Sequence, residues 1–238
     1  MTANRAASIH ARLKQHPHTS KQDFNLTLTQ YGLERLLYRL SVSEHAPNFL
    51  LKGALLFQLW YGQSHRPTRD AGYGGVRIDL RATLDGPRLA LQVDIGFGDA
   101  VTPEAQPITY PTLLNDVPAP SLRAYPKATV VTEKLHAVTV LGITNTRMKD
   151  FFDLWVLLHD STLDDAELQR AIEATFVRRQ TAMPGTQPIG LSDVFAEDAT
   201  KQVQWRAFLK KNRLQAMDLG DVIRYVRERT RHFGFADT

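Results

Sequence analysis

At residues 147–154 the chain reads Arg-Met-Lys-Asp-Phe-Phe-Asp-Leu, and this run opens a stretch that is apolar on most sides. Such a stretch is typical of a buried helix, which we expect from Lys149 to His159. Asp150 and Asp153 stand three residues apart, so they share one face of that helix, in its first turns. The helix dipole favours carboxylates there, and capping alone could explain either acid. Charges beside so apolar a helix normally need partners, and the run is therefore a candidate site.

The rest of the second half is also helical in pattern. Val130 to Leu141 predicts a helix that Gly142 closes. Asp164 and Glu167 have the spacing of a capping box at the start of a helix that ends near Arg179. Ser192 caps a further short helix, and residues 202–214 and 219–231 predict the last two.

The first half changes period along its length. Helical patterns cover its beginning, including residues 50–61, a helix expected to open at Gly53. Residues 76–84 and 88–97 then alternate with period two on either side of Asp85-Gly86, a dipeptide typical of a tight hairpin turn. In the second of these strands Asp94 falls on the polar face, away from the apolar row.

A proline-rich passage separates the halves. Prolines at 103, 107, 111, 118, 120 and 126 predict an extended crossing loop, because proline lacks an amide donor and fixes its own backbone angle. We expect a domain boundary in this passage. It separates an α/β domain at residues 1–125 from an all-helical C-terminal domain at residues 126–238.

The composition favours a soluble globular protein of one large or two small domains. The chain has 238 residues, of which 43% are hydrophobic and 23% charged. It has no cysteine, which excludes disulfides and thiolate zinc sites. Neither a signal peptide nor an apolar run of membrane-spanning length is apparent, so we expect a cytoplasmic protein without membrane contact.

A positive charge suggests a polyanionic partner. The net charge is +4 and the sequence pI is about 9.4. Solvated helix faces and a nucleic-acid surface explain the excess equally well at this stage. The cations gather in the last third, at Arg178, Arg179, Lys210, Lys211, Arg213, Arg224, Arg227, Arg229 and Arg231.

Two earlier stretches suggest a nucleotide and metal site. In Lys52-Gly53-Ala54, a glycine at a helix start would let backbone amides approach a phosphate, although a plain helix start explains it too. Residues 65–70 end in Asp70, and Asp94 lies beyond it. Nucleotidyl transfer uses carboxylates that hold two metal ions, usually from a D-x-D pair and a third acid. Here the pair is broken after Asp70, and turn, cap or strand-end roles remain open for both acids.

Taken together, these pieces resemble the AbiEii-type nucleotidyltransferase toxins, the toxin half of a class of bacterial toxin–antitoxin and abortive-infection systems. The matching segments occur in the family's order and extend over most of the chain. They are residues 49–54, 66–70, 93–95, 132–134 and 147–154.

The resemblance implies an α+β fold in which a polymerase-β-like nucleotidyltransferase domain with a mixed sheet precedes a helical C-terminal domain. Known members transfer nucleotides from a nucleoside triphosphate (NTP), in some cases to the 3′ end of tRNA, which blocks aminoacylation and translation. The resemblance therefore implies Mg²⁺ or Mn²⁺ as cofactor, tRNA or another RNA as substrate, and an antitoxin protein as partner. We expect a monomer.

The same resemblance assigns roles to residues. Asp70 and Asp94 would be metal ligands and, with Lys134 and Asp150, the catalytic set. Lys134 would face the phosphates, Asp150 would be the essential acid of the last motif, and Asp153 would support it. The nucleotide would be bound by Lys52, Gly53, Ala54, Arg66, Arg69, Lys134, Arg147 and Lys149.

One departure from the family pattern stands out. Members of this subgroup read T-R-D-x-D and continue for several dozen residues before a tyrosine-glycine-glycine strand entry. This chain passes from Asp70 to Tyr73-Gly74-Gly75 almost at once. We predict that an internal segment is missing and that the second metal carboxylate is missing with it; Asp79 and Asp99 are not at the right spacing to replace it. The alternatives are then an active transferase, a module that binds RNA or an antitoxin without transfer, and an unrelated α/β domain that matches by chance.

Overall fold

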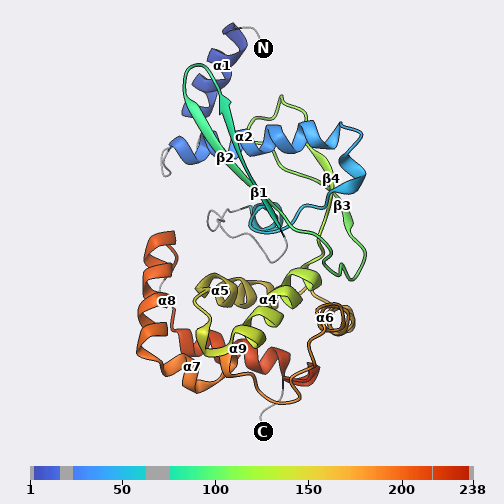
Figure 1. The fold of residues 1–238 in the computed structure, drawn as a ribbon. Coiled ribbons are helices and arrows are strands. Elements are labelled where there is room, and N and C mark those ends of the chain that lie inside the picture. The colour runs from blue at the N-terminus through green and yellow to red at the C-terminus, as the bar shows by residue number, and fades with distance from the viewer. Residues whose placement is uncertain (1–2, 17–23, 63–74, 216, 236–238) are drawn as a thin grey trace. The chain divides into compact units, whose positions relative to one another are not determined.

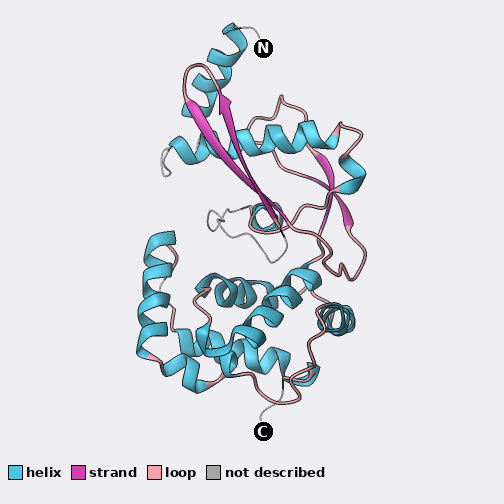
Figure 2. Ribbon diagram, viewed as in Figure 1, coloured by secondary structure: helices cyan, strands magenta, loops and turns pink. Residues whose placement is uncertain are grey.

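The chain folds into two compact units. A computed structural model describes residues 3–16, 24–62, 75–215 and 217–235 (Figure 1). Contacts group residues 1–98 with 106–124 in the first unit, and residues 99–105 with 125–238 in the second. Helices and two short antiparallel strand pairs make up the described part, which confirms the α+β class (Figure 2). None of the helices in these ranges has the length and hydropathy needed to cross a membrane.

The first unit begins with helices. They are α1 (Ala3–Lys14), α2 (Phe24–Ser41), a 3₁₀ turn (Ala46–Asn48) and α3 (Leu55–Tyr61). The helix expected to open at Gly53 begins two residues later, at Leu55. Gly53 has a φ of 80°, in the left-handed region, and this keeps Gly53 itself out of the helix. Leu51 instead forms a parallel β-bridge with Ala124.

The predicted hairpin is confirmed. Strands β1 (Val76–Thr83) and β2 (Arg88–Ile95) pair antiparallel, and the turn between them has positive φ at Asp85 (49°) and Gly86 (98°). Leu89 and Leu91 are buried against a core that α1 and α2 complete. Figure 1 shows this hairpin crossing α2. The alternation places Asp94 on the opposite face, across from Arg77.

The proline-rich passage is not only a loop, and this part of the prediction was wrong. It contains strands β3 (Gln106–Thr109) and β4 (Ser121–Ala124), which pair antiparallel. Pro107 lies within β3. In a two-stranded sheet each strand is an edge strand, where a residue without an amide donor is tolerated. Strands of four residues leave too short a pattern for period two to reveal.

The second unit is helical, and its predicted helices are confirmed. Helix α5 (Met148–Leu158) packs against α4 (Lys127–Leu141), α8 (Ala199–Asn212) and α9 (Leu219–Thr230). Phe151, Leu154 and Leu157 on α5 have no exposed surface. Gly142 caps α4 with a φ of 48°, and the Asp164 carboxylate accepts the Glu167 amide hydrogen at the start of α6. The helices are α4 (Lys127–Leu141), α5 (Met148–Leu158), α6 (Asp165–Arg178), α7 (Asp193–Glu197), α8 (Ala199–Asn212) and α9 (Leu219–Thr230), with 3₁₀ turns at 142–144, 189–191 and 231–233.

A buried carboxyl group distinguishes the core of the first unit. Glu34 on α2 has no exposed surface; one of its oxygens accepts the Leu113 amide hydrogen at 3.1 Å, and the other has no hydrogen-bond partner in the described part of the chain. Burial raises the pKa of Glu34 to about 7, against the opposing effects of the Leu113 amide and the nearby Arg35. Glu34 therefore carries its proton in the folded state under mildly acidic conditions.

Glu34→Gln should change how stability depends on pH. Because the folded pKa lies above the unfolded one, the contribution of Glu34 is fully present below about pH 4 and is lost as pH rises to about 7. Relative to wild type, the variant should gain up to about 3 kcal/mol in unfolding free energy between these limits. Urea unfolding at pH 5 and pH 8 measures the difference. An equal difference in unfolding free energy between variant and wild type at both pH values would contradict this prediction.

Candidate functional site

The predicted residues of the second unit form a cluster around a lysine. Lys134 on α4 donates to Asp150 Oδ1 at 3.0 Å and to Asp153 Oδ2 at 2.6 Å, both on α5. The two acids share a helix face, as their spacing predicts. Asp150 and Asp153 are 0% and 1% exposed, so both carboxylates have left water. Their ion pairs with Lys134 compensate that loss, which a capping role alone would not do.

An arginine completes this cluster from the start of α5. Arg147 Nε lies 2.8 Å from Asp150 Oδ2, a contact between charges whose angle falls outside hydrogen-bond geometry. The Arg147 amide donates to the Asn145 side-chain oxygen at 2.8 Å, and Asn145 is itself buried. Lys201, a buried residue of α8, donates to the Asn145 carbonyl at 3.0 Å. Sequence reasoning missed Asn145 and Lys201, because only the fold brings α8 to this loop.

The side chains of the cluster differ in how much of their surface is exposed to solvent. The Asp150 and Asp153 side chains are each 1% exposed, whereas Lys134 is 14% and Arg147 44% exposed. The acids therefore orient the cations; Arg147 is partly exposed to solvent, whereas Lys134 is mostly buried. Such an arrangement can bind a phosphate group with a fixed ammonium and a planar guanidinium. Lys149, also on α5, is half-buried.

Lys134→Met should destabilise the protein by about 3–5 kcal/mol at neutral pH, because it leaves two buried carboxylates without this cation. Chemical unfolding at neutral pH measures the loss. In the control Arg224→Met, the exposed pair with Asp221 should be worth less than about 1 kcal/mol. Equal losses in the two variants would contradict a supporting role for the pair of acids.

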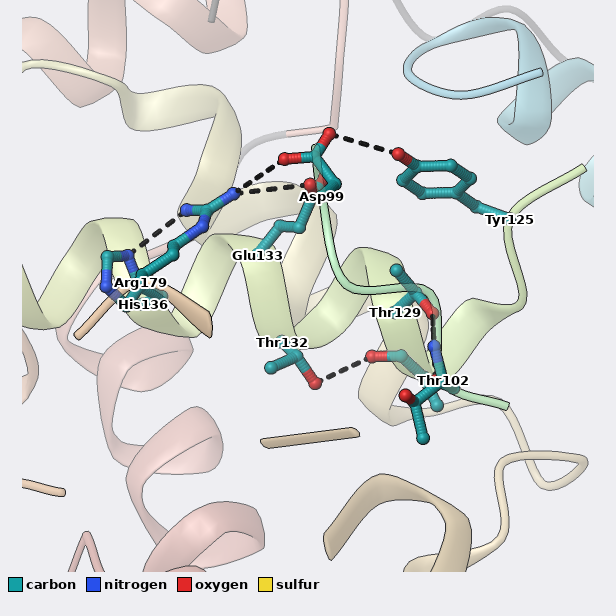
Figure 3. A network of polar contacts seen from close by, with 9 residues as sticks. Asp99, Thr102, Tyr125, Thr129, Thr132, Glu133, His136 and Arg179 are labelled. Atoms are coloured by element: carbon teal, nitrogen blue, oxygen red, sulfur yellow. Dashed lines mark hydrogen bonds and ion pairs between the residues drawn. The ribbon is translucent and has the colours of Figure 1, made fainter. Parts of the chain in front are cut away.

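A second polar network includes Glu133, the residue of α4 that precedes Lys134 (Figure 3). Arg179, at the end of α6, lies 3.3 Å from a Glu133 carboxylate oxygen and 3.5 Å from Asp99 Oδ1. Tyr125 donates its hydroxyl hydrogen to the other Asp99 oxygen at 3.0 Å. Burial, and then the charge of Asp99, raise the pKa of the Tyr125 hydroxyl, so the tyrosine remains a donor. This network joins α4, α6 and the 99–105 segment.

The same segment is held to α4 a second time. The Thr129 hydroxyl donates to the Thr102 carbonyl at 2.8 Å and accepts the Thr102 amide hydrogen at 3.1 Å (Figure 3). Residues 99–105 are thus a docked part of the helical unit, although strands of the first unit flank them in sequence. Asp99 is accordingly engaged by Arg179 and Tyr125.

The network also fixes the protonation of a histidine. Arg179 can only donate, so its contact of 3.2 Å with His136 Nδ1 makes that nitrogen an acceptor. The ring hydrogen is then on Nε2, which donates to the Thr181 hydroxyl at 2.9 Å. Burial, and next the charge of Arg179, lower the pKa of His136 to about 4. His136 is therefore neutral throughout the physiological range.

Arg179→Met should raise the pKa of His136 while leaving it below its ordinary value. The substitution removes the charge of Arg179 but not the burial, which is the larger cause. An NMR titration of the His136 ring protons measures the change. An unchanged or lower pKa for His136 in the variant would contradict the assignment.

The predicted residues of the first unit show less of a site. Asp94 is held by Arg77 in a two-pronged contact, Nε to Oδ1 at 2.7 Å and Nη2 to Oδ2 at 3.1 Å. Lys52, Gly53 and Ala54 precede α3, a helix of only seven residues. Arg66, Arg69 and Asp70 lie outside the described residues. Within the described ranges, no group of three or more histidine or acidic side chains could hold a metal ion.

A surface hollow offers no alternative site. It measures about 670 Å³ and is lined by residues 158–165 and Arg229. Its acids are already engaged: Asp160 contacts Lys127, Asp164 caps α6, and Asp165 pairs with Arg229 at 3.0 Å. None of the residues that the sequence singles out for chemistry lines it.

Comparison with known families removes one of the three sequence-based alternatives. A family model described as nucleotidyl transferase AbiEii toxin, type IV toxin–antitoxin system, matches residues 35–71 and 70–229. The chain belongs to the AbiEii family. A chance match of an unrelated α/β domain is thereby excluded. Curated proteins gave no match to this chain.

Membership in the AbiEii family accounts for the general class of activity. Its members are nucleotidyl transferase toxins, which implies a nucleotide substrate and an antitoxin partner. The Lys134 cluster lies within the second matched segment. The two segments overlap at residues 70–71, at the junction where the sequence predicts a missing segment.

Proposed function

We propose that this AbiEii chain transfers a nucleoside monophosphate from an NTP to RNA, at the 3′ end of tRNA, and so blocks translation in the cytoplasm until an antitoxin restrains it. The Lys134 cluster carries the proposal. Two buried carboxylates hold one lysine in place beside a half-exposed arginine, in a chain of a nucleotidyl transferase family. The proposal takes residues 1–125 as the nucleotidyltransferase domain, residues 126–238 as the helical domain, and a monomer as the active form.

Each residue of the cluster has a distinct task in this proposal. Lys134 places an ammonium against the triphosphate, where negative charge grows on the departing pyrophosphate. Arg147 contacts two phosphate oxygens with its planar guanidinium. Asp150 touches both cations and is buried, so it acts as a positioning residue that aims them at the phosphates. Asp153 fixes Lys134 from its second side, and Lys149 adds positive charge on the same helix.

The proposal takes Mg²⁺ or Mn²⁺ as cofactor, with Asp70 and Asp94 as its proposed ligands. In nucleotidyl transfer the ion is bound by one or two carboxylates together with the substrate phosphates. Of the two proposed ligands, Asp94 is bonded by Arg77, and Asp70 lies outside the described residues. The described residues therefore do not fit a metal site as they stand. The nucleotide-binding roles of Lys52, Gly53, Ala54, Arg66 and Arg69 are likewise assigned by family resemblance.

A second candidate function rests on the junction after Asp70. The family match is divided at residues 70–71, which supports the loss of a segment there, and Asp94 is neutralised by Arg77. A chain without the second metal carboxylate would bind RNA or an antitoxin without transferring nucleotides. The helical unit, with its intact cluster, is common to both candidates.

A transfer assay separates the two functions. The protein is incubated with each labelled NTP, Mg²⁺ and total tRNA, and label on RNA is measured. We expect transfer that EDTA abolishes and that Arg147→Gln lowers by about 10²-fold, the usual effect of removing one donor to a developing charge. Arg147 is 44% exposed, so its replacement should leave the fold intact.

Arg224→Gln, which removes an exposed arginine of α9, is the matched control and should transfer as wild type. Absence of label for all four nucleotides, with tRNA still bound, would reject the transferase and favour the binding module. Equal transfer by Arg147→Gln and the control would reject the role of the cluster.

A further inference from the structure

The cations of helices α8 and α9 fall into two groups that the sequence does not distinguish. On α9 three arginines are engaged with carboxylates: Arg224 with Asp221 at 2.9 Å, Arg227 with Asp193 at 3.1 Å, and Arg229 with Asp165 at 3.0 Å. Their charges are largely balanced within the helical unit. An anionic partner would have to displace these contacts.

Helix α8 differs in this respect. Between Ala199 and Arg213 it has no acidic residue, and its exposed cations are Arg206, Lys210, Lys211 and Arg213. None of the four pairs with a carboxylate within the part of the chain that the structure describes. We call these four residues the α8 basic face. Its charge is uncompensated, in contrast to that of α9.

Packing fixes which side of α8 this face occupies. Lys201, Trp205 and Leu209 are buried at intervals of four residues, so they form the inner side of the helix. Arg206 and Lys210, also four residues apart, lie on the solvent side with a rise of about 6 Å between them. The α8 basic face is therefore held in position by the core.

Helix stability alone does not account for the α8 basic face. Cations in the last turn interact favourably with the helix dipole, which explains Lys210 and Lys211. Arg206 lies farther from the end, and its like-charged neighbour Lys210 at i+4 is unfavourable for the isolated helix. A row of uncompensated charge with a small cost in stability is typical of a surface that meets a polyanion.

We propose that the α8 basic face binds the phosphodiester backbone of the RNA substrate, and that α9 does not. This inference rests on the proposed function for the identity of the polyanion as RNA. Lysine and arginine contacts to phosphates position an RNA without reading its sequence. The face would therefore hold tRNA irrespective of its anticodon.

Binding of a fluorescein-labelled tRNA at several salt concentrations tests this proposal. The triple variant Arg206→Gln, Lys210→Gln, Lys211→Gln should lower the slope of log affinity against log salt by about 2, at roughly 0.7 for each phosphate that the protein no longer neutralises. At 0.1 M salt this corresponds to a loss of affinity of about 10²-fold. The variant Arg206→Lys, Lys210→Arg, Lys211→Arg keeps the charges and should bind as wild type.

The matched control removes the same number of charges from α9, by Arg224→Gln, Arg227→Gln and Arg229→Gln. It should keep the wild-type slope, and thermal melting of each variant verifies folding. Equal losses in the α8 and α9 variants would show that net charge alone matters and would overturn the proposal. Wild-type binding by the α8 variant would also overturn it and would favour an acidic protein as the partner of this face.

The transfer assay on the same proteins distinguishes this proposal from the proposed function. If wild type binds tRNA through α8 but transfers no label, the transferase fails and the α8 proposal stands. If wild type transfers label and the α8 variant binds tRNA unchanged, the α8 proposal fails and the transferase stands.

Discussion

The ion pairs of Lys134 with Asp150 and Asp153 are the constraint on which the second unit depends. They join α4 to α5 through charges that lie almost wholly away from water. Buried charges of this kind cost more than they return unless each has its partner, so the arrangement is not explained as a source of stability. Its geometric result is a lysine held from two sides and an arginine whose side chain is 44% exposed. Under the proposed function, these are the cations that meet the triphosphate.

A second network, around Arg179, joins parts of the second unit through neutral and charged groups together. Arg179 connects two carboxylates and a neutral histidine, and it thereby fastens the 99–105 segment to α4 beside the Lys134 cluster. Tyr125, two residues before α4, and Thr129 on α4 hold the same segment. Because α4 carries both networks, its orientation is determined from two sides. This explains why Thr132, Glu133 and Lys134 occur together in the sequence: Thr132 bonds within the helix, Glu133 serves the second network and Lys134 the first.

How much the sequence predicts differs between the units for physical reasons. Helices of the second unit have strong 3.6-residue patterns and clear caps at Gly142 and Asp164, and the spacing of Asp150 and Asp153 already places them on one face. The β3–β4 pair was missed because four-residue strands with Pro107 carry almost no pattern. The partners Asp99, Asn145 and Arg179 could not be found either, since they meet α4 and α5 only through the fold. For Asp94, the sequence supplied the correct face of β2 but not Arg77, which the hairpin register places opposite it.

Helix α8 contacts the surroundings of the Lys134 cluster through its inner side. Lys201 reaches from this helix to the Asn145 carbonyl, next to the turn that sets Arg147, while Arg206 and Lys210 point the other way. One helix therefore sets the angular relation between a support of the turn at residues 145–147 and a row of surface charge. Inserting or deleting a single residue between Lys201 and Arg206 would turn one side by roughly 100° relative to the other. Residues on the outer side of α8 can be exchanged as long as the charge of the basic face is kept, but the length of the helix at this point cannot change without disturbing one of these two orientations.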